Sequence, residues 1–409
     1  MTLALVNDPV VLVDDAGWLV NGLKYGGGTG YAVLVTFGGT VWDITAYAAT
    51  ITARRGRTRE LDTFTTGTAT IDLQNYDRIF DPLYTAGPFY GLIVPRIPVT
   101  ITKDGTTIFG GVVEDWGLQY EVDGTSVAAM MCVDRLAILA QTQLNAYTNV
   151  QSTPGARIAA VIGRPEIAYT GATNLDGGFA ILQADTVAQD TDTLGYLQQV
   201  TQTDVGRLFV DRSGVLRYRD RTSGVTSGET VIFADAATSY TAPVVKFSAI
   251  KVEVGSEFLF NRVTATRTGG VAQTVSDATS IASYGIRSLA RGTVLFNDDA
   301  DTSAYAAYLL SQYKDATIRV VSHDVVLGGL GATAKAAMLA LEIGDTVRTV
   351  WTPRSTGNQV DVLSLVEGIE HRIGVDVHTM TVQLTPLTVG GFILGSATDG
   401  ILGTSVLTY

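Results

Sequence analysis

The stretch ARRGRTRELDTFTTGTATIDLQNYDRIFDPLY, residues 53–84, decides the fold class of this chain. In its second half Ala69, Ile71 and Leu73 alternate with polar residues. That period of two is typical of a strand with one buried face. An Asp-Pro pair follows, and such pairs favour turns because Asp can bond its own backbone and Pro fixes φ. The stretch therefore predicts a strand that ends in an ordered corner.

The residues that follow this strand point to a small β unit. Phe80 and Tyr84 lie at the corner, where they are placed to cap the open end of a small barrel. The sequence KDGT at 103–106 is a two-residue Asp-Gly hairpin signal, and YEVDGT at 120–125 contains a second one. Short strands joined by such hairpins indicate a small barrel or sandwich.

Before the strand, four arginines form the basic cluster of an otherwise acidic chain: Arg54, Arg55, Arg57 and Arg59. We expect them on a glycine-punctuated loop. A solvated loop needs no function, and a contact with a neighbouring subunit is the alternative. Arginine suits bidentate carboxylate contacts at interfaces, so the cluster is a candidate salt-sensitive clasp.

Composition limits the remaining possibilities. The chain has 409 residues, of which 46% are hydrophobic and 17% charged, so it is expected to be well folded and to form more than one domain. No apolar run is long enough to span a membrane. The net charge of −12 argues against a protein that grips nucleic acid by its phosphates. The single cysteine, Cys132, lies in a strand-like apolar run and is expected to be a buried thiol.

Changes of pattern along the chain divide it into segments. After 144 the period becomes helical, with Pro154 opening one predicted helix and Asp192 capping another. After 245 short strands return, interrupted by a predicted helix at 301–314. The expected organisation is an N-terminal arm at 1–34, a first β-barrel domain at 35–144, an α+β domain at 145–244, a second β-barrel domain at 245–387 with a helical insertion at about 300–340, and a C-terminal docking tail at 388–409.

The tail consists of two aliphatic clusters spaced by glycines. Because exposed apolar clusters favour aggregation, we expect the tail to dock in a groove of the same or an adjacent subunit. Its candidate interface residues are Phe392, Ile393, Leu394, Ile401 and Leu402.

Several motifs suggest chemistry, but each has a simpler explanation. The glycines at 328–331 outline a dinucleotide loop, which requires a parallel βαβ unit, whereas the flanking segments look like hairpins. The three histidines, His323, His371 and His378, match no zinc spacing. Asp298, Asp299 and Asp301 are better explained as helix capping than as calcium ligands.

Catalytic signatures are also missing from the sequence. Glu114 and Asp115 are adjacent in a predicted strand, so they point to opposite faces and are disfavoured as a catalytic pair. No nucleophile elbow and no Walker loop is present. We therefore predict neither enzymatic activity nor a cofactor or metal.

Several segments in order carry a resemblance to a known family. The arginine-rich loop is followed by ELDTFTTGTATIDLQNYDRIFDP at 60–82, PFYG at 88–91, PRIPV at 95–99 and FGGVVED at 109–115. Together they resemble the minor tail or tail-tip hub proteins of long-tailed bacteriophages. The glycine-spaced C-terminal end is similar to the tails of the same proteins.

This resemblance implies a mainly β fold of two small barrels with a smaller α+β domain. It further implies a homotrimer in the virion tail tip, whose six barrels match a sixfold tail tube to threefold parts below. Its partners would be a distal tail protein ring, the end of the tape-measure protein, and a central fibre or spike. DNA would cross the lumen only in transit, and the lumen is expected to be net negative.

Two other function classes are kept as alternatives. A β-rich receptor- or carbohydrate-binding tail protein would need exposed aromatic platforms. Its candidates are Trp18, Trp42, Trp116 and Trp351, although burial is the ordinary state of tryptophan in strands. The other alternative, a cell-wall hydrolase, lacks a lytic motif.

Overall fold

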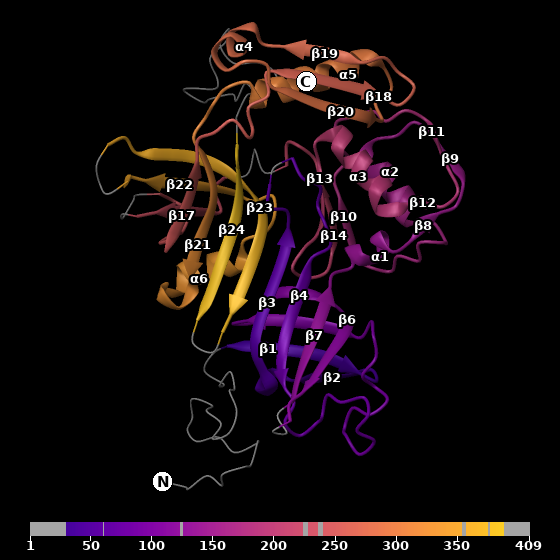
Figure 1. Ribbon diagram of the computed structural model, residues 1–409, viewed down its shortest axis with the longest axis vertical. Coiled ribbons are helices and arrows are strands. Elements are labelled where there is room, and N and C mark those ends of the chain that lie inside the picture. Colours follow the sequence, from indigo (N-terminus) through magenta and orange to yellow (C-terminus); the bar gives the residue numbers. More distant parts are fainter. Residues whose placement is uncertain are drawn as a thin grey trace.

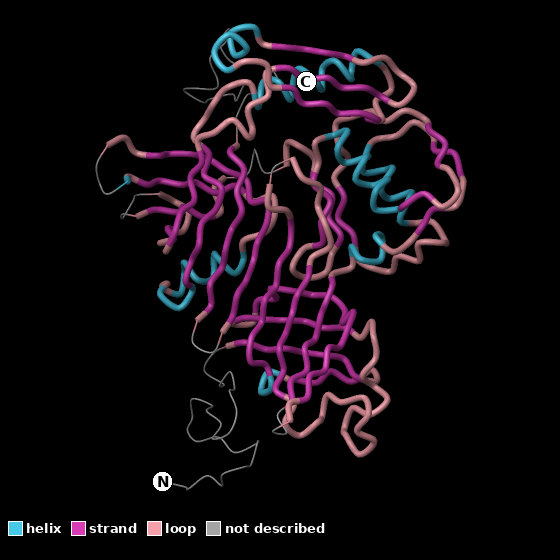
Figure 2. The backbone as a smooth tube through the Cα atoms, in the orientation of Figure 1, coloured by secondary structure: helices cyan, strands magenta, loops and turns pink. Residues whose placement is uncertain are grey.

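The structure is a computed structural model, and it confirms a mainly β fold with a smaller helical part (Figures 1 and 2). It describes residues 30–59, 61–122, 126–223, 228–235, 240–353, 357–374 and 377–387.

The first β unit follows the pattern expected from the opening stretch. Its strands are β1 (Tyr31–Phe37), β2 (Thr40–Asp43), β3 (Ala48–Gly56), β4 (Thr68–Gln74), β5 (Pro98–Lys103), β6 (Thr106–Tyr120) and β7 (Ser126–Val133), with a 3-10 turn η1 (Thr45–Tyr47). The start of β6 pairs with β5 and its later part pairs with β7, so the sheet folds over along this long strand (Figure 2).

The core of this unit lies between the folded layers. Phe80 at the predicted corner is fully buried, and its ring stacks on those of Phe89 and Trp116. Cys132 is buried, as expected, and burial raises the pKa of its thiol. At the Asp-Gly hairpin, Asp104 and Gly105 both have positive φ, as a type I′ turn requires.

The second β unit also has seven strands. They are β15 (Val231–Ala234), β16 (Val244–Val245), β17 (Ala249–Glu253), β21 (Arg319–Val326), β22 (Thr346–Trp351), β23 (Val360–Ile373) and β24 (His378–Pro386). A 3-10 turn η2 (Leu327–Gly329) and α6 (Ala332–Ala340) connect β21 to β22.

The two units have the same strand order, which the sequences were too different to reveal. Counted along the chain within each unit, the strands lie side by side in the order 3-4-7-6-5-1-2. The units differ in strand direction at two pairings. β1 runs antiparallel to β2, whereas β15 runs parallel to β16. β1 also runs antiparallel to β5, whereas its counterpart β15 runs parallel to β22.

The units are not separate barrels. β3 of the first unit pairs with β23 of the second, and this joins all the strands into one 14-stranded sheet (Figure 1). One apolar core cluster also runs through both units. The two expected β units are both present, and they share a continuous backbone ladder.

The middle of the chain forms the α+β part. Its elements are α1 (Leu136–Ala140), β8 (Gln143–Leu144), β9 (Tyr147–Asn149), α2 (Pro154–Ile162), β10 (Thr173–Leu175), β11 (Asp185–Val187), β12 (Thr191–Asp192), α3 (Thr193–Asp204), β13 (Arg207–Val210) and β14 (Leu216–Arg219). The predicted cap is present, since the Asp192 carboxylate accepts a hydrogen bond from the Gly195 amide at 2.6 Å.

A further segment packs against this middle part. It contains β18 (Arg262–Arg267), β19 (Gln273–Ser276), α4 (Ala278–Tyr284), β20 (Ser288–Val294) and α5 (Asp299–Tyr313). The sequence placed these strands in the second barrel, but they pair only with one another in a separate three-stranded sheet. Their apolar faces share a core with α2 and α3, so this segment is an insertion between β17 and β21.

Three other expectations about boundaries change. β15 lies in the segment expected to be the α+β domain at 145–244, but it pairs with β22 of the second unit. The sheet begins at Tyr31, inside the segment expected to be an arm. The helical insertion expected at about 300–340 is interrupted by β21, so α5 and α6 belong to different parts of the fold. Residues 1–29 and the C-terminal tail at 388–409 lie outside the described residues.

Candidate functional site: the junction of the two β units

The junction between β3 and β23 brings two glycines into close backbone contact. Gly56 pairs with Gly368 at the end of the ladder, and Gly56 has a φ of +89°. A Cβ added to Gly56 would lie 2.2 Å from the Glu367 carbonyl oxygen. Only glycine tolerates this conformation and this approach, so the sequence RRG at 54–56 fixes how closely the units meet.

A buried carboxylate with two arginines secures the junction. Glu367 is 1% exposed, and its Oε2 accepts a hydrogen bond from Arg57 Nε at 2.8 Å. Its Oε1 accepts bonds from Arg207 Nε at 3.2 Å and Nη2 at 3.0 Å. Burial alone would raise the pKa of Glu367, but the two guanidiniums outweigh it and lower that pKa. The carboxylate therefore stays charged and ties three parts of the chain together.

A second ion pair lies on the neighbouring residue of β3. Arg55 is 3% exposed and its Nη1 lies 2.5 Å from Glu342 Oε1. Glu342 Oε2 accepts a further hydrogen bond from the backbone amide of Arg212 at 3.0 Å. Glu342 thus connects the first β unit, the β13–β14 hairpin and the turn before β22.

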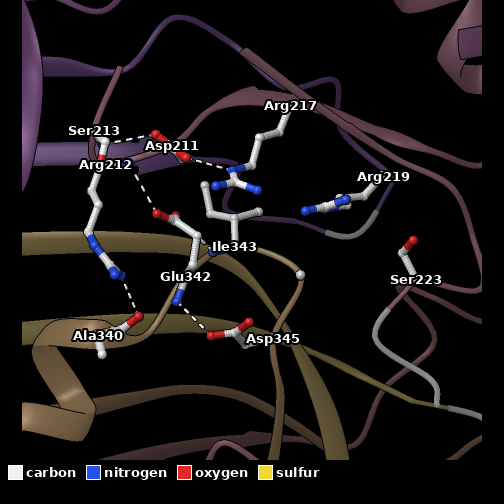
Figure 3. Close-up of a pocket in the computed structure, with 11 residues that line it drawn as sticks. Asp211, Arg212, Ser213, Arg217, Arg219, Ser223, Ala340, Glu342, Ile343 and Asp345 are labelled. Atoms are coloured by element: carbon white, nitrogen blue, oxygen red, sulfur yellow. Dashed lines mark hydrogen bonds and ion pairs between the residues drawn. The ribbon is translucent and has the colours of Figure 1, made fainter. Parts of the chain in front are cut away.

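A pocket of about 560 Å³ opens beside Glu342 (Figure 3). One wall is the β13–β14 hairpin with Arg212, Arg217 and Arg219, and the opposite wall is the turn at 340–345. Its arginines are engaged: Arg217 Nε bonds Asp211 Oδ2 at 2.5 Å, and Arg219 Nη1 bonds Asp176 Oδ1 at 2.7 Å. Arg217 and Arg219 are thus paired with carboxylates, whereas Arg212 Nη1 donates to the Ala340 and Leu341 carbonyls.

Other residues of the pocket are held by contacts within the chain. Within the part of the chain that the structure describes, no three His, Cys, Asp or Glu side chains gather as a metal site. Asp345, at the pocket floor, has a pKa raised by burial and by the nearby Glu342 carboxylate, and its Oδ2 accepts the Glu342 amide at 2.9 Å. Charged side chains from three segments of the chain therefore meet at this pocket.

The four arginines of the predicted clasp divide into two kinds. Arg54 and Arg55 belong to β3, where a loop was expected. Arg55 and Arg57 are held inside the chain by Glu342 and Glu367. Arg54 is exposed and donates to the Thr58 hydroxyl, and Arg59 forms an exposed pair with Glu257 at 2.9 Å. Of the cluster, Arg54 and Arg59 remain candidates for contact with a neighbour.

The other proposed interface residues, Phe392, Ile393, Leu394, Ile401 and Leu402, lie outside the described residues. Trp18 does so as well. Of the remaining tryptophans, Trp42 is 45% exposed with its ring edge against Phe89, while Trp116 and Trp351 are half-buried. Trp42 and Trp116 both pack against the aromatic cluster of the first unit, through Phe89 and Phe37 respectively.

The glycine-rich stretch before α6 does not form a dinucleotide loop. The strand that precedes it, β21, runs antiparallel to both β17 and β24, so the parallel crossover that such a loop needs is missing here. The acidic residues before α5 act as predicted, because Asp298 Oδ1 accepts the Asp301 amide at 2.8 Å.

The histidines are more deeply buried than the sequence suggested. His371 Nδ1 and His378 Nε2 lie 3.0 Å apart in the core near β3. Burial lowers the pKa of His378 to about 4 and the pKa of His371 well below its ordinary value. His323 bonds the Thr349 hydroxyl at 2.9 Å, and burial lowers its pKa to about 3. All three are neutral core residues at pH 7.

Sequence reasoning missed the carboxylates of the junction and Arg207. Glu342 lies in a turn and Glu367 in a strand, and neither residue was predicted to belong to a site. Glu367 does carry a signal: VVED at 112–115 and LVEG at 365–368 place a glutamate after two aliphatic residues. In the structure both glutamates lie where the strand register shifts.

The same architecture occurs in solved structures of other proteins. A scan of protein-family models and a search of curated proteins find no match. Among solved structures, a tail protein from Neisseria meningitidis aligns with a TM-score of 0.62 at 12% identity over 88% of this chain and 97% of that one. The 43 kDa tail protein of prophage MuSo2 from Shewanella oneidensis gives 0.58 at 16% identity over 87% and 97%.

A third structure, the prophage tail protein gp18 from Listeria monocytogenes, gives 0.51 at 10% identity over 88% and 96%. The chain has the fold of phage tail proteins. The similarity covers nearly the whole of each of these proteins, so the tail-protein fold includes both β units and the middle part. In the described residues, no helix is long and apolar enough to cross a membrane.

Proposed function

We propose that this protein is a structural component of a phage tail tip: a hub that assembles as a trimer. The observation that carries the proposal is the repeated strand order of the two β units within one chain. Three chains with two comparable units each present six units, so a trimer can match a sixfold ring on one side and threefold parts on the other. The tail-protein fold supports the same assignment.

The engaged charges at the junction support a scaffold role. The Glu367 and Glu342 ion pairs fix the two units of one chain relative to each other. A hub needs such fixed geometry, because its ring must meet its neighbours without adjustment. We propose a non-enzymatic role on the same ground.

In this role the chain would contact a distal tail protein ring, the end of the tape-measure protein and a central fibre or spike. DNA would pass through the ring at ejection. The net charge of −12 suits a lumen that repels phosphate and does not retain it.

The mass of the native assembly tests the proposal. Native mass spectrometry of the purified chain should show three copies, and negative-stain images should show a ring with six lobes. In images of the whole particle the ring should lie at the tail tip. A ring of a different copy number, or a location along the tail shaft, would overturn the hub assignment.

A further inference from the structure

The internal repeat gives a residue-by-residue equivalence between the two β units. The registers of β6 with β5 and β7 match those of β23 with β22 and β24, so Glu114 corresponds to Glu367 and Tyr120 to Ile373. Each of the two long strands has a register shift at the equivalent glutamate.

The equivalence exposes one difference between the two long strands. In β23, residues 368–373 lie between β24 and β3. In β6, the equivalent residues 115–120 pair with β7 on one side, and no strand of the described residues lies on the other side. The place that β3 fills in the second unit is therefore open in the first.

The strand equivalent to β3 has a matching open edge. The sequence of β3 reads ITARRG at 51–56; β17 and the two residues after it read IKVEVG at 250–255. The registers of β3 with β4 and of β17 with β21 make Ile51 equivalent to Ile250. β17 pairs with β21 only, among the described strands. Among the described strands, each chain thus has one complete junction and two complementary half-junctions.

The exposure of side chains also differs between the in-chain junction and the two open strand edges. On β3, Ile51, Ala53 and Arg55 are buried by the junction. Their equivalents at 250–254 are less buried: Ile250 and Val252 of β17 are half-buried, and Val254, directly after β17, is 69% exposed. On β6, Tyr120 is 49% exposed where its equivalent Ile373 is buried. Apolar side chains that a junction would cover are left open at both edges.

We propose that β17 of one copy pairs antiparallel with residues 115–120 of β6 in the next copy, and that this pairing repeats the in-chain β3–β23 junction between chains. The proposal rests on the proposed trimeric ring and names the edges that close it. A contact between two different edges is heterologous, and it generates a closed ring when the rotation between copies closes.

Transferring the in-chain register predicts six residue pairs between copies, one of which joins Asp115 to Gly255 in place of Gly368 with Gly56. One face would carry Trp116 with Val254, Leu118 with Val252 and Tyr120 with Ile250. The other face would carry Gly117 with Glu253 and Gln119 with Lys251. Aromatic and aliphatic residues thus meet on one side, and no like charges lie opposite each other, which is what stabilises cross-strand pairs.

The half-junctions lack the ionic lock of the in-chain junction. Glu114 is held by Arg96 at 3.4 Å and by Gln141 Nε2 at 3.0 Å within its own unit. The chain after β17 reads SEF at 256–258, where RTR at 57–59 follows β3. Association between copies would therefore depend on backbone pairing and apolar contact, and would be only weakly sensitive to salt.

Disulfide trapping tests the register directly. Gly117→Cys with Glu253→Cys should give a ladder of covalent species that ends at three chains under mild oxidation. A Cβ at Gly117 meets only ordinary contacts with Ala129 and Met131, so this variant is expected to fold. The in-chain equivalent, Arg54→Cys with Glu370→Cys, is the matched control and should form an intramolecular bond.

A register-shifted pair, Gly117→Cys with Lys251→Cys, should cross-link at least tenfold more slowly, since cross-strand partners two residues apart lie about 7–8 Å apart or somewhat less. Trapping by the shifted pair at the same rate, or no intermolecular bond while the in-chain control closes, would overturn the inference. If native mass still gives a trimer in that case, the proposed function stands and the copies meet through other surfaces.

A disruption experiment provides an independent readout. Val254→Asp should weaken trimer formation at least tenfold and leave the monomer folded, because Val254 is 69% exposed in the isolated chain. Val271→Asp, at a similarly exposed valine of the insertion, should leave the trimer intact. Equal behaviour of the two variants in light scattering and native mass would overturn the inference.

Discussion

The two β units share a strand order, but they connect β3 to β4 and β17 to β21 in very different ways. In the first unit residues 57–67 suffice, whereas in the second unit residues 254–318 carry a complete small sheet with two helices. The insertion packs on the α+β part and not on the second unit. The comparison shows that the two units share the arrangement of their strands. They differ in the length and structure of the segment that connects their third strand to their fourth.

The largest effect is expected where the repeat places two glycines in unlike surroundings. Gly56→Ala should lower the free energy of unfolding by about 3 kcal/mol, because φ is positive and the new Cβ would collide with the Glu367 carbonyl. Gly255→Ala meets nothing within 4 Å and should change it by less than about 0.5 kcal/mol. Urea unfolding of both variants measures the difference, and similar values would contradict the assigned junction.

The equivalent glutamates sharpen the comparison further. Glu367→Gln leaves Arg57 and Arg207 without their buried counter-charge and should cost about 3 kcal/mol. Glu114→Gln removes a part-exposed pair with Arg96 and should cost less than about 1 kcal/mol. Both changes keep the side-chain shape, so thermal and urea unfolding report the loss of charge. An equal loss of unfolding free energy in the two variants would contradict the stabilising role assigned to Glu367 at the junction.

A core substitution tests the pH dependence of the second unit. The registers make His323 and Thr349 equivalent to Ile71 and Ile101 of the first unit. Because burial lowers the folded pKa of His323 to about 3, its neutral form contributes stability above pH 6.5 that is lost as the pH falls. Each pH unit below 6.5 costs about 1.4 kcal/mol for one such proton.

Converting this pair to that of the first unit, by His323→Ile with Thr349→Ile, should remove that contribution. Between pH 7 and pH 5 the variant should lose about 2 kcal/mol less unfolding free energy than the wild type. Asp134, whose pKa burial raises to about 7, titrates in the opposite sense, but it is present in both proteins and cancels in the comparison. Parallel pH profiles would contradict the burial of neutral His323.

The smallest effect is expected at the exposed end of the arginine cluster. Arg59→Gln breaks a solvent-exposed pair with Glu257 and should change the stability of the isolated chain by no more than about 0.5 kcal/mol. The same change at Arg57 should cost several times more, because Arg57 meets the buried Glu367. Urea unfolding in low and high salt separates the two, and a large effect at Arg59 would require a contact not seen within the chain.

Local patterns predicted much of the fold. The alternation at 69–73, the Asp-Gly turn at 104–105 and the caps Asp192 and Asp298 occur as expected, because each depends on residues close in sequence. Long-range pairing could not be predicted in this way. Nothing in the alternation at 50–56 indicates that β3 will pair with a strand more than three hundred residues later.

The site was harder to predict than the fold for a related reason. The arginines were identified, but their partners Glu342 and Glu367 come from turns and strands with no local charge pattern. His323 lies in β21, and its burial depends on neighbours such as Phe233 and Thr349 from other segments. A residue's partners are set by topology, which composition and spacing do not encode.

The shared strand β23 has a mechanical consequence. A hinge motion between the two β units would have to break the pairing of β3 with β23 and expose Glu367 to solvent. We therefore expect the two units to move as one rigid body. In the proposed ring, any widening of the passage would then occur at the contacts between chains, which we propose to lack a buried ion pair. Such an assembly would thus be flexible at the contacts between copies and rigid within each copy.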